Sequence, residues 1–571
     1  MHDSRIRRAR RRNRRGSVLI LSAVLMIVMM GAIALSVDTG YMYTMQAQLD
    51  RAVDSAALAG ATELVNGQLA ANSRAVEYLA RNPVGSGQFI LDEDELERRL
   101  SEFREKYEEE IDVAVGNWNT DTGQFETTNE LPSAVRVTMR YPQQPLFFAR
   151  IFGQKSFDIT SEAIARYQPR DIALVLDFSA SMNDDSDLAS INRLGFSAIH
   201  NNLFQMWDDL GRPQYGNLTF EPDWVTIPGT RTSARVRWRS THVDVTASSN
   251  FRRCKLYYAN GRRQTFSCNT RARTFSGTGS NYGQRIVKCK VKVGSKWETV
   301  DFYKNSHIKR GLGLNGVSYP YASGSWDDLI NYCRSHNSSM PYYDHNVYAA
   351  GYRRKFGVLC LINYWNRYKP RKTQTADLWK ASAQPITAVK NSVDIFLDYV
   401  GAGATEDRVA FSLYNSNSGE AKLEKQLTNN LAQVMHLVRR RQAGHYHSMT
   451  NIAAGMRRGR IEMDQRGRIG AFRMMVLMTD GQANWVNGSY NPTLAKQRVI
   501  DEAHLAKNRG YPIMTISLGA NADSDLMQDV ADITKGVHFN IPGGQTVAEY
   551  SDELNDVFRR IAQARPLTLV R

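Results

Sequence analysis

The feature that most constrains this chain is a run of twenty residues without a charge, Val18 to Val37. As a helix this run would extend about 30 Å, the thickness of the hydrocarbon core of a bilayer. Residues 1–15 before it hold eight arginines and one aspartate, a net charge of +7. Arginines on this side favour a cytoplasmic N-terminus. We therefore predict a basic cytoplasmic segment at 1–16, a transmembrane helix at 17–37 and an extracytoplasmic remainder.

A cleaved signal peptide is the alternative to a retained anchor. Ala32-Ile33-Ala34 is an acceptable cleavage pattern, and Arg14-Arg15 has some likeness to a twin-arginine signal. The anchor is favoured because the helical pattern continues past Val37. Residues 38–80 are predicted as one helix with a face of small residues, which would permit close packing either on its own domain or on another subunit.

A small α+β domain is predicted at 81–168. Asn82-Pro83 ends the helical pattern, and Asp92 to Glu110 forms a highly charged stretch that is typical of a solvated helix. Residues 111–168 then alternate between polar and apolar types, as strands do. Nothing in this domain has the pattern of a catalytic site.

The character of the sequence changes at Asp171. The run from Ile172 to Leu176 is continuously apolar, which indicates a strand buried on both faces, and similar runs recur within 408–414, 474–478 and 512–518. Helical patterns lie between them, so we predict an α/β fold with a doubly wound parallel sheet, formed by 169–207 and 376–571. Ligands of such sheets bind at the carboxyl ends of the strands.

A β-rich insertion is predicted at 208–375, where this alternation stops. Residues 231–310 hold nineteen lysines and arginines against three acidic residues, a net +16, so the chain outside this stretch and the N-terminus sums to 16 − 16 − 7 = −7. All five cysteines lie in the insertion, and outside the cytoplasm they would form up to two disulfides and leave one odd thiol. A hairpin turn at Asn260-Gly261 would place Cys254 and Cys268 on opposite faces, so their pairing stays unassigned. The absence of a CxxC pair argues against zinc.

Oxygen-bearing side chains follow the predicted buried strands. Asp177, Ser179 and Ser181 come directly after the first strand, Asp480 follows the strand at 474–478, and Thr450 precedes a helix. Oxygen ligands without histidine or cysteine suit a hard cation, Mg²⁺ or Mn²⁺, at near-octahedral geometry. The five residues are therefore the candidate metal site.

This order of motifs resembles the metal-ion-dependent adhesion site (MIDAS) of von Willebrand factor A (vWA) domains. The matching elements are Asp-Phe-Ser-Ala-Ser at 177–181, Thr450 before a helix and Thr-Asp-Gly at 479–481. The resemblance implies that Ser179, Ser181 and Thr450 bind the metal through their hydroxyls, while Asp177 and Asp480 act mostly through bound water. It also implies an open coordination position for a carboxylate from a protein partner.

The N-terminal part resembles the TadG-like proteins of the tight-adherence (Flp) pilus system, many of which carry a C-terminal vWA domain. The residues that carry this resemblance are Arg-Gly-Ser-Val at 15–18, Val-Asp-Thr-Gly-Tyr at 37–41 and, above all, Asp-Ser-Ala-Ala-Leu-Ala-Gly-Ala at 54–61. A prepilin processing site would place glutamate five residues after Gly16, where Leu21 stands. This departure favours an anchored accessory subunit over a fibre subunit.

The insertion should emerge at the rim of the metal face, because it interrupts the chain between the Asp-x-Ser-x-Ser loop and the helix predicted at 378–400, with only a short apolar-periodic segment at 191–206 before it. Its cations, interleaved with aromatic residues, could bind an anionic polymer, or they could form an ordinary basic surface, which is slightly favoured. Outside the cytoplasm, acidic glycans, lipid headgroups or an acidic partner fit better than nucleic acid. His445 and His447 are interpreted as exposed loop residues, because no third ligand accompanies them.

These features predict a protein of the bacterial inner membrane, with one membrane-embedded helix and most of the chain in the periplasm. Pilus assembly or surface adhesion through the Mg²⁺ site is the leading hypothesis, with pilus or envelope components as partners. The alternative is a carbohydrate- or acidic-polymer-binding module that uses the insertion. No phosphate-binding loop, GxSxG motif or paired-carboxylate pattern is present, so an enzyme is not expected.

Overall fold

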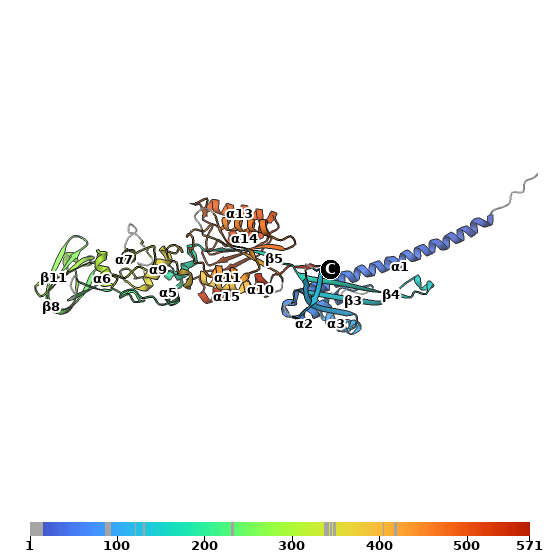
Figure 1. The fold of residues 1–571 in the computed structure, drawn as a ribbon, viewed down its shortest axis with the longest axis horizontal. Helices are drawn as coiled ribbons and strands as arrows, with labels where there is room; N and C mark the ends of the chain where they lie inside the picture. The colour runs from blue at the N-terminus through green and yellow to red at the C-terminus, as the bar shows by residue number, and fades with distance from the viewer. Residues whose placement is uncertain are drawn as a thin grey trace, which may run out of the picture. The chain divides into compact units, whose positions relative to one another are not determined.

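The computed structural model describes residues 15–85, 93–119, 122–129, 132–229, 233–335, 342, 345, 350–402, 405–415 and 420–570. The chain forms two compact units, which are described separately (Figure 1). The first unit comprises 1–169, 402–406 and 565–571, and the second comprises 170–401 and 407–564. Residues 1–14 of the predicted basic segment lie outside the described residues.

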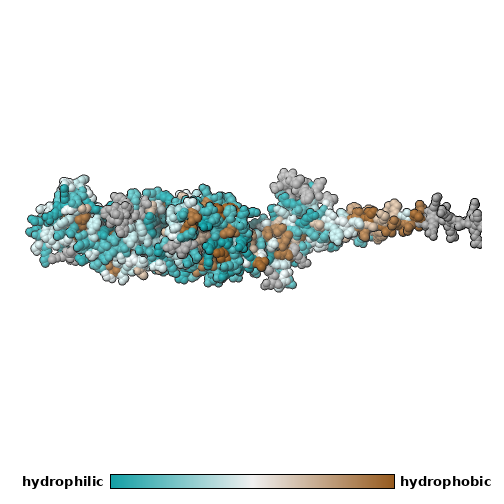
Figure 2. All heavy atoms as spheres, turned by 90° about the horizontal axis from the view of Figure 1, so that it is seen from above, coloured by the Kyte–Doolittle hydropathy of each residue, from teal (hydrophilic) through white to brown (hydrophobic). Residues whose placement is uncertain are grey.

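The first unit begins with a long helix, α1 (Arg15–Thr62). Its segment from Val18 to Val37 is apolar and exposed (Figure 2), and α1 is long and apolar enough to cross a membrane. From Asp38 onward one face of α1 is buried by its own unit, and this face includes Met45, Leu49 and Val53.

The prediction of one helix over 38–80 was wrong. α1 ends at Thr62, a 3-10 turn follows at Leu64–Asn66, and α2 (Gln68–Arg81) returns against α1. Gly60 permits this return, because a Cβ there would lie only 3.1 Å from both Ala71 O and Ala75 Cβ. The small-residue face of α1 therefore packs within its own domain.

A five-stranded antiparallel sheet completes the first unit, in the order β19-β4-β3-β1-β2. Its strands are β1 (Ile111–Asn119), β2 (Gln124–Thr127), β3 (Ala134–Pro145), β4 (Ser156–Tyr167) and β19 (Leu567–Leu569), and α3 spans Glu93–Tyr107. The predicted vWA boundary at 571 was wrong, because β19 pairs with β4 and so covers an otherwise open sheet edge.

The second unit is built on a six-stranded sheet in the order β13-β12-β5-β14-β17-β18. The strands β5 (Arg170–Asp177), β12 (Arg408–Tyr414), β14 (Phe472–Thr479), β17 (Ile513–Leu518) and β18 (His538–Ile541) are parallel, and β13 (Lys422–Thr428) is an antiparallel edge. Every residue of β5 is buried, as its continuous apolar run predicts.

Helices cover both faces of this sheet, as Figure 1 shows. The helices α10 (Ile386–Gly401), α11 (Leu431–Arg439) and α15 (Val547–Gln563) cover one face; α12 (Ile452–Arg466), α13 (Pro492–Asn508) and α14 (Ser524–Thr534) cover the other. The predicted doubly wound fold is confirmed. β13, β18 and α14 were not predicted; β13 and β18 are the two edge strands, which are not buried on both faces.

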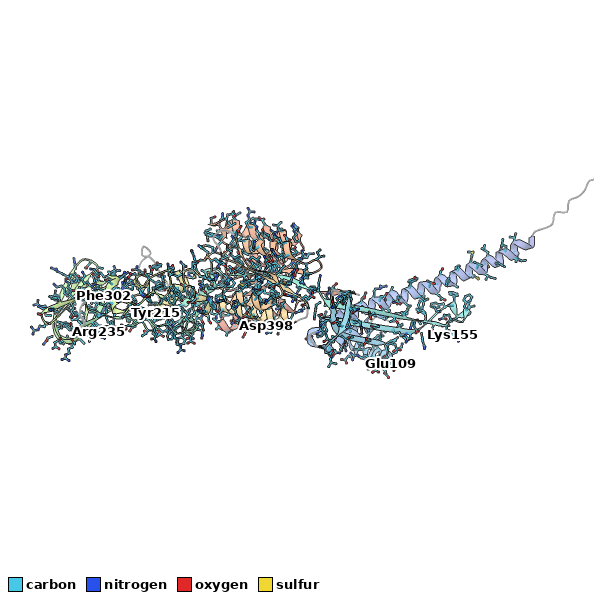
Figure 3. The ribbon with its side chains drawn as sticks, in the orientation of Figure 1. Glu109, Lys155, Tyr215, Arg235, Phe302 and Asp398 are labelled. Atoms are coloured by element: carbon cyan, nitrogen blue, oxygen red, sulfur yellow. The ribbon has the colours of Figure 1, made fainter. Side chains whose placement is uncertain are left out.

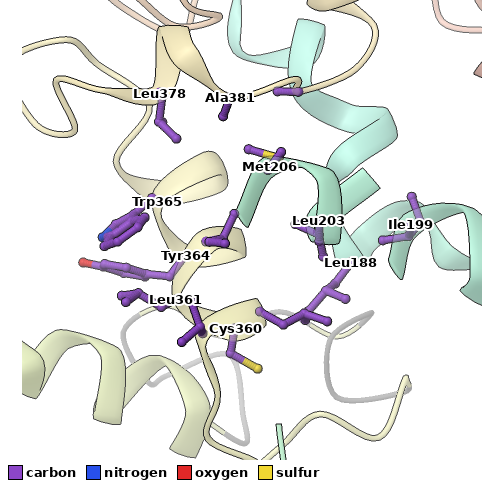
Figure 4. Packing of buried hydrophobic residues seen from close by; sticks show 14 of the residues in the cluster. Leu188, Ile199, Leu203, Met206, Cys360, Leu361, Tyr364, Trp365, Leu378 and Ala381 are labelled. Carbon is purple, nitrogen blue, oxygen red and sulfur yellow. The ribbon is translucent and has the colours of Figure 1, made fainter. Parts of the chain in front are cut away.

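The region between β5 and α10 has its own sheet, in the order β11-β10-β8-β7-β6, with β9 also paired to β8. Its strands are β6 (Thr226–Pro228), β7 (Ala234–Trp238), β8 (His242–Tyr258), β9 (Arg263–Ser276), β10 (Ile286–Val293) and β11 (Lys296–Asp301); its helices are α4 (Ile191–Leu194), α5 (Phe196–Asp209), α6 (Asn305–Gly311), α7 (Trp326–Arg334) and α9 (Val358–Tyr368). α5 packs on α9, and Leu203 and Leu361 belong to one core (Figure 4).

The cysteines of this region are thiols that lie close in two pairs. Cys254 Sγ and Cys289 Sγ are 3.7 Å apart on the buried face of β8 and β10, and Cys333 is hydrogen-bonded to Cys360. Cys268 is the remaining thiol. The expectation of up to two disulfides and one odd thiol stays a prediction, and these neighbours are the pairs that oxidation would join.

Candidate functional site

The five candidate residues lie at the carboxyl end of the parallel sheet. Asp177 is the last residue of β5, and Asp480 directly follows Thr479, the last residue of the adjacent β14. The loop after β5 enters a 3-10 segment (Ala180–Ser186) that carries Ser181. The strands therefore bring together side chains about 300 residues apart in the sequence.

Asp177 is fully buried and accepts hydrogen bonds from both loops. The backbone N–H of Ser179 donates to its Oδ1 at 2.8 Å, and the Thr479 hydroxyl donates to its Oδ2 at 2.8 Å. Thr479 also accepts from the Gly481 N–H at 3.2 Å. Asp177 thus fixes the conformations of both loops that carry the other candidate residues.

Three oxygens form a row across these loops. Ser179 Oγ lies 2.9 Å from Ser181 Oγ, which donates to Asp480 Oδ1 at 2.7 Å. Neighbouring ligands of an octahedral Mg²⁺, each about 2.1 Å from the ion, lie about 3.0 Å apart. The spacings of 2.9 and 2.7 Å are those of hydrogen bonds, and they are also close to this separation of adjacent ligands.

Thr450 approaches the same row from the loop before α12. A Cβ built on Gly481 would lie 3.6 Å from Ser181 Oγ and 3.9 Å from Thr450 Oγ1, so both hydroxyls border one small space. The Thr450 carbonyl accepts from the Trp485 N–H at 3.2 Å, which ties this loop to the one after β14. All five predicted residues therefore lie in one cluster.

The two carboxyl groups of the cluster are ionised only at a cost. Burial raises the pKa of Asp177 above its ordinary value, although hydrogen bonds from Ser179 and Thr479 act in the opposite direction. Burial, followed by the charge of Asp177, raises the pKa of Asp480 well above the ordinary range. Two carboxylates this close and this buried repel each other, and a divalent cation between them would offset both costs.

Thr479 belongs to the Thr-Asp-Gly motif, but its hydrogen bond to Asp177 was not predicted, and neither was a role for the acidic run that follows Ser181. A small pocket beside Asp480 is lined in part by Ser181, Asp184, Asp185, Arg193 and Tyr550. Asp185 pairs with Arg193 at 2.5 Å, whereas burial and the charge of Asp187 raise the pKa of Asp184 to about 7. The signal was present in Asn-Asp-Asp-Ser-Asp at 183–187, directly after the motif.

Helix α9 of the inserted region fastens this loop. Asn363 accepts from the Leu188 N–H at 2.8 Å, Asn366 donates to the Ser186 carbonyl at 3.1 Å, and Arg367 pairs with Asp187 at 3.1 Å. These contacts place α9 against the loop that follows Ser181, whereas the position of the rest of the insertion at the rim of the metal face stays a prediction.

The interpretation of His445 as an exposed loop residue was wrong. His445 is buried, its Nδ1 lies 3.4 Å from the Gln442 N–H, and burial lowers its pKa to about 3. His447 is half-buried. Among the described residues, no group of three histidine, cysteine or acidic side chains could hold a metal.

Three family models match the chain. The Flp pilus-assembly TadE/G-like model matches residues 16–63, the Tad-like Flp pilus-assembly model matches 59–165, and the von Willebrand factor type A domain model matches 379–553. The chain is a TadG-like Flp pilus-assembly protein with a C-terminal vWA domain. This membership supports a role in pilus assembly or adhesion, with protein partners in the pilus or envelope. Together with the apolar part of α1, it also supports a single-pass membrane protein.

Solved structures similar to the TadG-like chain include BatB from Bacteroides thetaiotaomicron, at 13% identity over 30% of this chain and 89% of that one, with a TM-score of 0.23. The SpRpn10 VWA domain matches at 14% identity over 29% and 82%, with a TM-score of 0.23. The pilus adhesin SpaC from Lactobacillus rhamnosus GG matches at 15% identity over 30% and 28%, with a TM-score of 0.23. No similar protein is found among the curated proteins.

Proposed function

We propose that this TadG-like protein captures an acidic group of a pilus or envelope partner through Mg²⁺, or Mn²⁺, held at its vWA site. The observation that carries the proposal is the row of Ser179, Ser181 and Asp480 oxygens at 2.9 and 2.7 Å, beside Thr450 and above the buried Asp177. Ser179, Ser181 and Thr450 would hold the ion through hydroxyls. The bound ion would supply the positive charge that a partner carboxylate needs to dock.

The division of roles follows from exposure. Asp177 and Ser179 are fully buried, whereas Ser181 is half-buried and borders the pocket beside Asp480. A partner carboxylate would reach the ion from this pocket, while Asp177 would orient the loops from beneath. The hydroxyl and carboxylate oxygens converge on one small space where they could hold an ion, so binding rather than catalysis is the proposed activity.

The site would act outside the cytoplasm. The arginines of residues 1–15 precede the apolar part of α1, which favours a cytoplasmic N-terminus and an extracytoplasmic vWA domain. A protein anchored in this way in the inner membrane could organise pilus or envelope components at the periplasmic surface.

The metal proposal predicts a pH-dependent stabilisation by Mg²⁺. The pKa of both carboxyl groups is higher in the folded protein than in the unfolded chain, where it is about 3.8. Without the ion, the free energy of unfolding therefore falls as the pH rises above this unfolded-state pKa. The ion binds the ionised forms and reverses this loss, so its effect must grow with pH. At 100 times its Kd, Mg²⁺ should stabilise the fold by about 2.7 kcal/mol at pH 8, and by less at pH 5.

The measurement is the thermal midpoint of the full-length protein in detergent, with Mg²⁺ or with chelator, at both pH values. K⁺ at matched ionic strength is the control, and it should give no comparable shift. An equal Mg²⁺ effect at pH 5 and pH 8, or no effect at either, would contradict the proposal.

A second candidate function is binding of an anionic polymer by the insertion. The β8–β10 register places Arg253, Lys255, Lys288, Lys290 and Lys292 on one sheet face, opposite the buried Cys254 and Cys289. Tyr257 and Trp297 lie among them, and Lys255 stands 5.7 Å from the Trp297 ring centroid. Asp301 pairs with Lys288 at 3.4 Å, so this face keeps a positive excess.

Charge reversal separates the two functions. Lys290→Glu with Lys292→Glu should reduce binding to an acidic polysaccharide at least tenfold at low salt and leave the Mg²⁺ stabilisation unchanged. If the double variant bound the polysaccharide with unchanged affinity, the basic face would not be the binding surface.

A further inference from the structure

The hairpin between β3 and β4 ends in an exposed apolar tip, residues 146–155, which we call the β3–β4 tip. Phe147 and Phe148 are 56% and 40% exposed, and Ile151 and Phe152 reach 79% and 83%. Figure 3 labels Lys155 at this end of the hairpin, beside α1. Four large apolar side chains this close together are costly to leave in water, and such patches mark interaction surfaces.

Hydrogen bonds to Asp38 hold the tip at one position along α1. Asp38 accepts hydrogen bonds from the backbone N–H groups of Phe147 at 2.9 Å, Phe148 at 3.1 Å and Ala149 at 2.7 Å. The Tyr41 ring packs edge-on against Phe147 at 5.0 Å between centroids. The tip therefore cannot slide along the helix without losing these contacts.

Asp38 marks the point where α1 leaves the apolar span. The large side chains from Val18 to Val37 are exposed, whereas Asp38 and then Met45 and Leu49 are buried by the first unit. The hydrogen bonds to Asp38 therefore place the tip beside the end of the segment that is apolar enough to cross a membrane.

We propose that the β3–β4 tip inserts into the bilayer beside α1, as a second and shallow membrane contact of the same unit. Ile151 and Phe152 would enter the acyl region, and the backbone near Asp38 would lie at headgroup level. The proposal does not depend on the metal site, because it concerns a different unit of the chain.

The composition of the tip favours a lipid surface over a protein partner. Residues 145–157 contain no acidic side chain, and Arg150 and Lys155 are exposed. Aromatic rings with cationic neighbours are typical of the interface of a bilayer with anionic headgroups. Any other occupant would have to share this position with the headgroups around α1.

A photoreactive benzoylphenylalanine at position 152 of the full-length protein tests the proposal in vesicles of phosphatidylethanolamine and phosphatidylglycerol. The matched control places it at Phe125 on β2, an aromatic position at the opposite end of the same sheet, where β1 meets the start of β3. We expect at least tenfold more lipid adduct at 152 than at 125. Asp38→Ala should lower the adduct at 152 severalfold, because the tip loses its attachment.

Mass spectrometry of the adducts distinguishes the outcomes. Lipid adducts at 152 that greatly exceed those at 125 support insertion. Adducts between two copies of the chain would overturn the proposal in favour of a protein interface, and equal lipid labelling at both positions would overturn it in favour of a tip in water.

Discussion

Replacing Asp177 and Asp480 together by alanine is expected to lower the Mg²⁺ affinity of the protein at least about 100-fold and to abolish its chelator-sensitive capture of partners from membranes. Residues that only support metal ligands cost about 10–100-fold when mutated, so removing both carboxylates should cost no less. The two carboxyl groups are the only charges with which the cluster's five residues can balance the ion. The measurement is a pull-down from solubilised membranes, with and without chelator, beside calorimetric titration of Mg²⁺.

Two variants keep this result interpretable. Ser181→Ala removes one hydroxyl from the row without touching the buried Asp177, and it should also weaken Mg²⁺ binding, by about tenfold or more. Asp529→Ala changes an exposed aspartate on α14 and should alter neither readout. If the double variant still captured its partner in a chelator-sensitive way, the proposed metal mechanism would be wrong.

The core of the second unit could be predicted because its strands are buried on both faces. A strand such as β5 has no polar face, so its apolar run is visible without knowledge of its neighbours. The proximity of the candidate residues could be predicted for a related reason: Asp177 ends one such strand, Asp480 directly follows another, and adjacent parallel strands end at the same edge.

The errors arose where long-range contacts decide the structure. β19 has three residues and becomes a strand only because β4 offers an unpaired edge. The end of α1 at Thr62 depends on the close contact of Gly60 with Ala71 and Ala75, which no local propensity reveals. His445 lies in a polar loop sequence but is buried, and its carbonyl accepts a hydrogen bond from the N–H of Lys372, which is distant in the sequence, at 3.0 Å.

The position of the β3–β4 tip also depends on long-range contacts and could not be predicted from the sequence. Leu146 to Phe152 is apolar apart from Arg150, and in the sequence this stretch is indistinguishable from strand residues. Only the hydrogen bonds from its backbone to Asp38, about 110 positions earlier, place it beside the transmembrane span. Its proposed membrane contact follows from position rather than composition alone.

The second unit begins with a buried ion pair that no sequence motif predicted. The Arg170 guanidinium is fully buried and donates to Asp407 Oδ2 from Nε at 3.0 Å and from Nη2 at 2.8 Å. Its Nη1 donates to the carbonyls of Ala562 at 2.9 Å and Ala564 at 3.1 Å. One side chain thus ties the starts of β5 and β12 to the end of α15.

Asp407→Ala is therefore expected to destabilise the second unit by about 3–5 kcal/mol, because it leaves the Arg170 charge buried without its carboxylate. Hydrogen exchange of the full-length protein in detergent measures this as a loss of protection in β5 and β12. Asp501→Ala, at the exposed Arg498–Asp501 pair of 3.3 Å, is the matched control and should cost no more than about 1 kcal/mol. Equal effects of the two substitutions would mean that the guanidinium is held by the α15 carbonyls alone, and that the carboxylate contributes no more than a surface charge does.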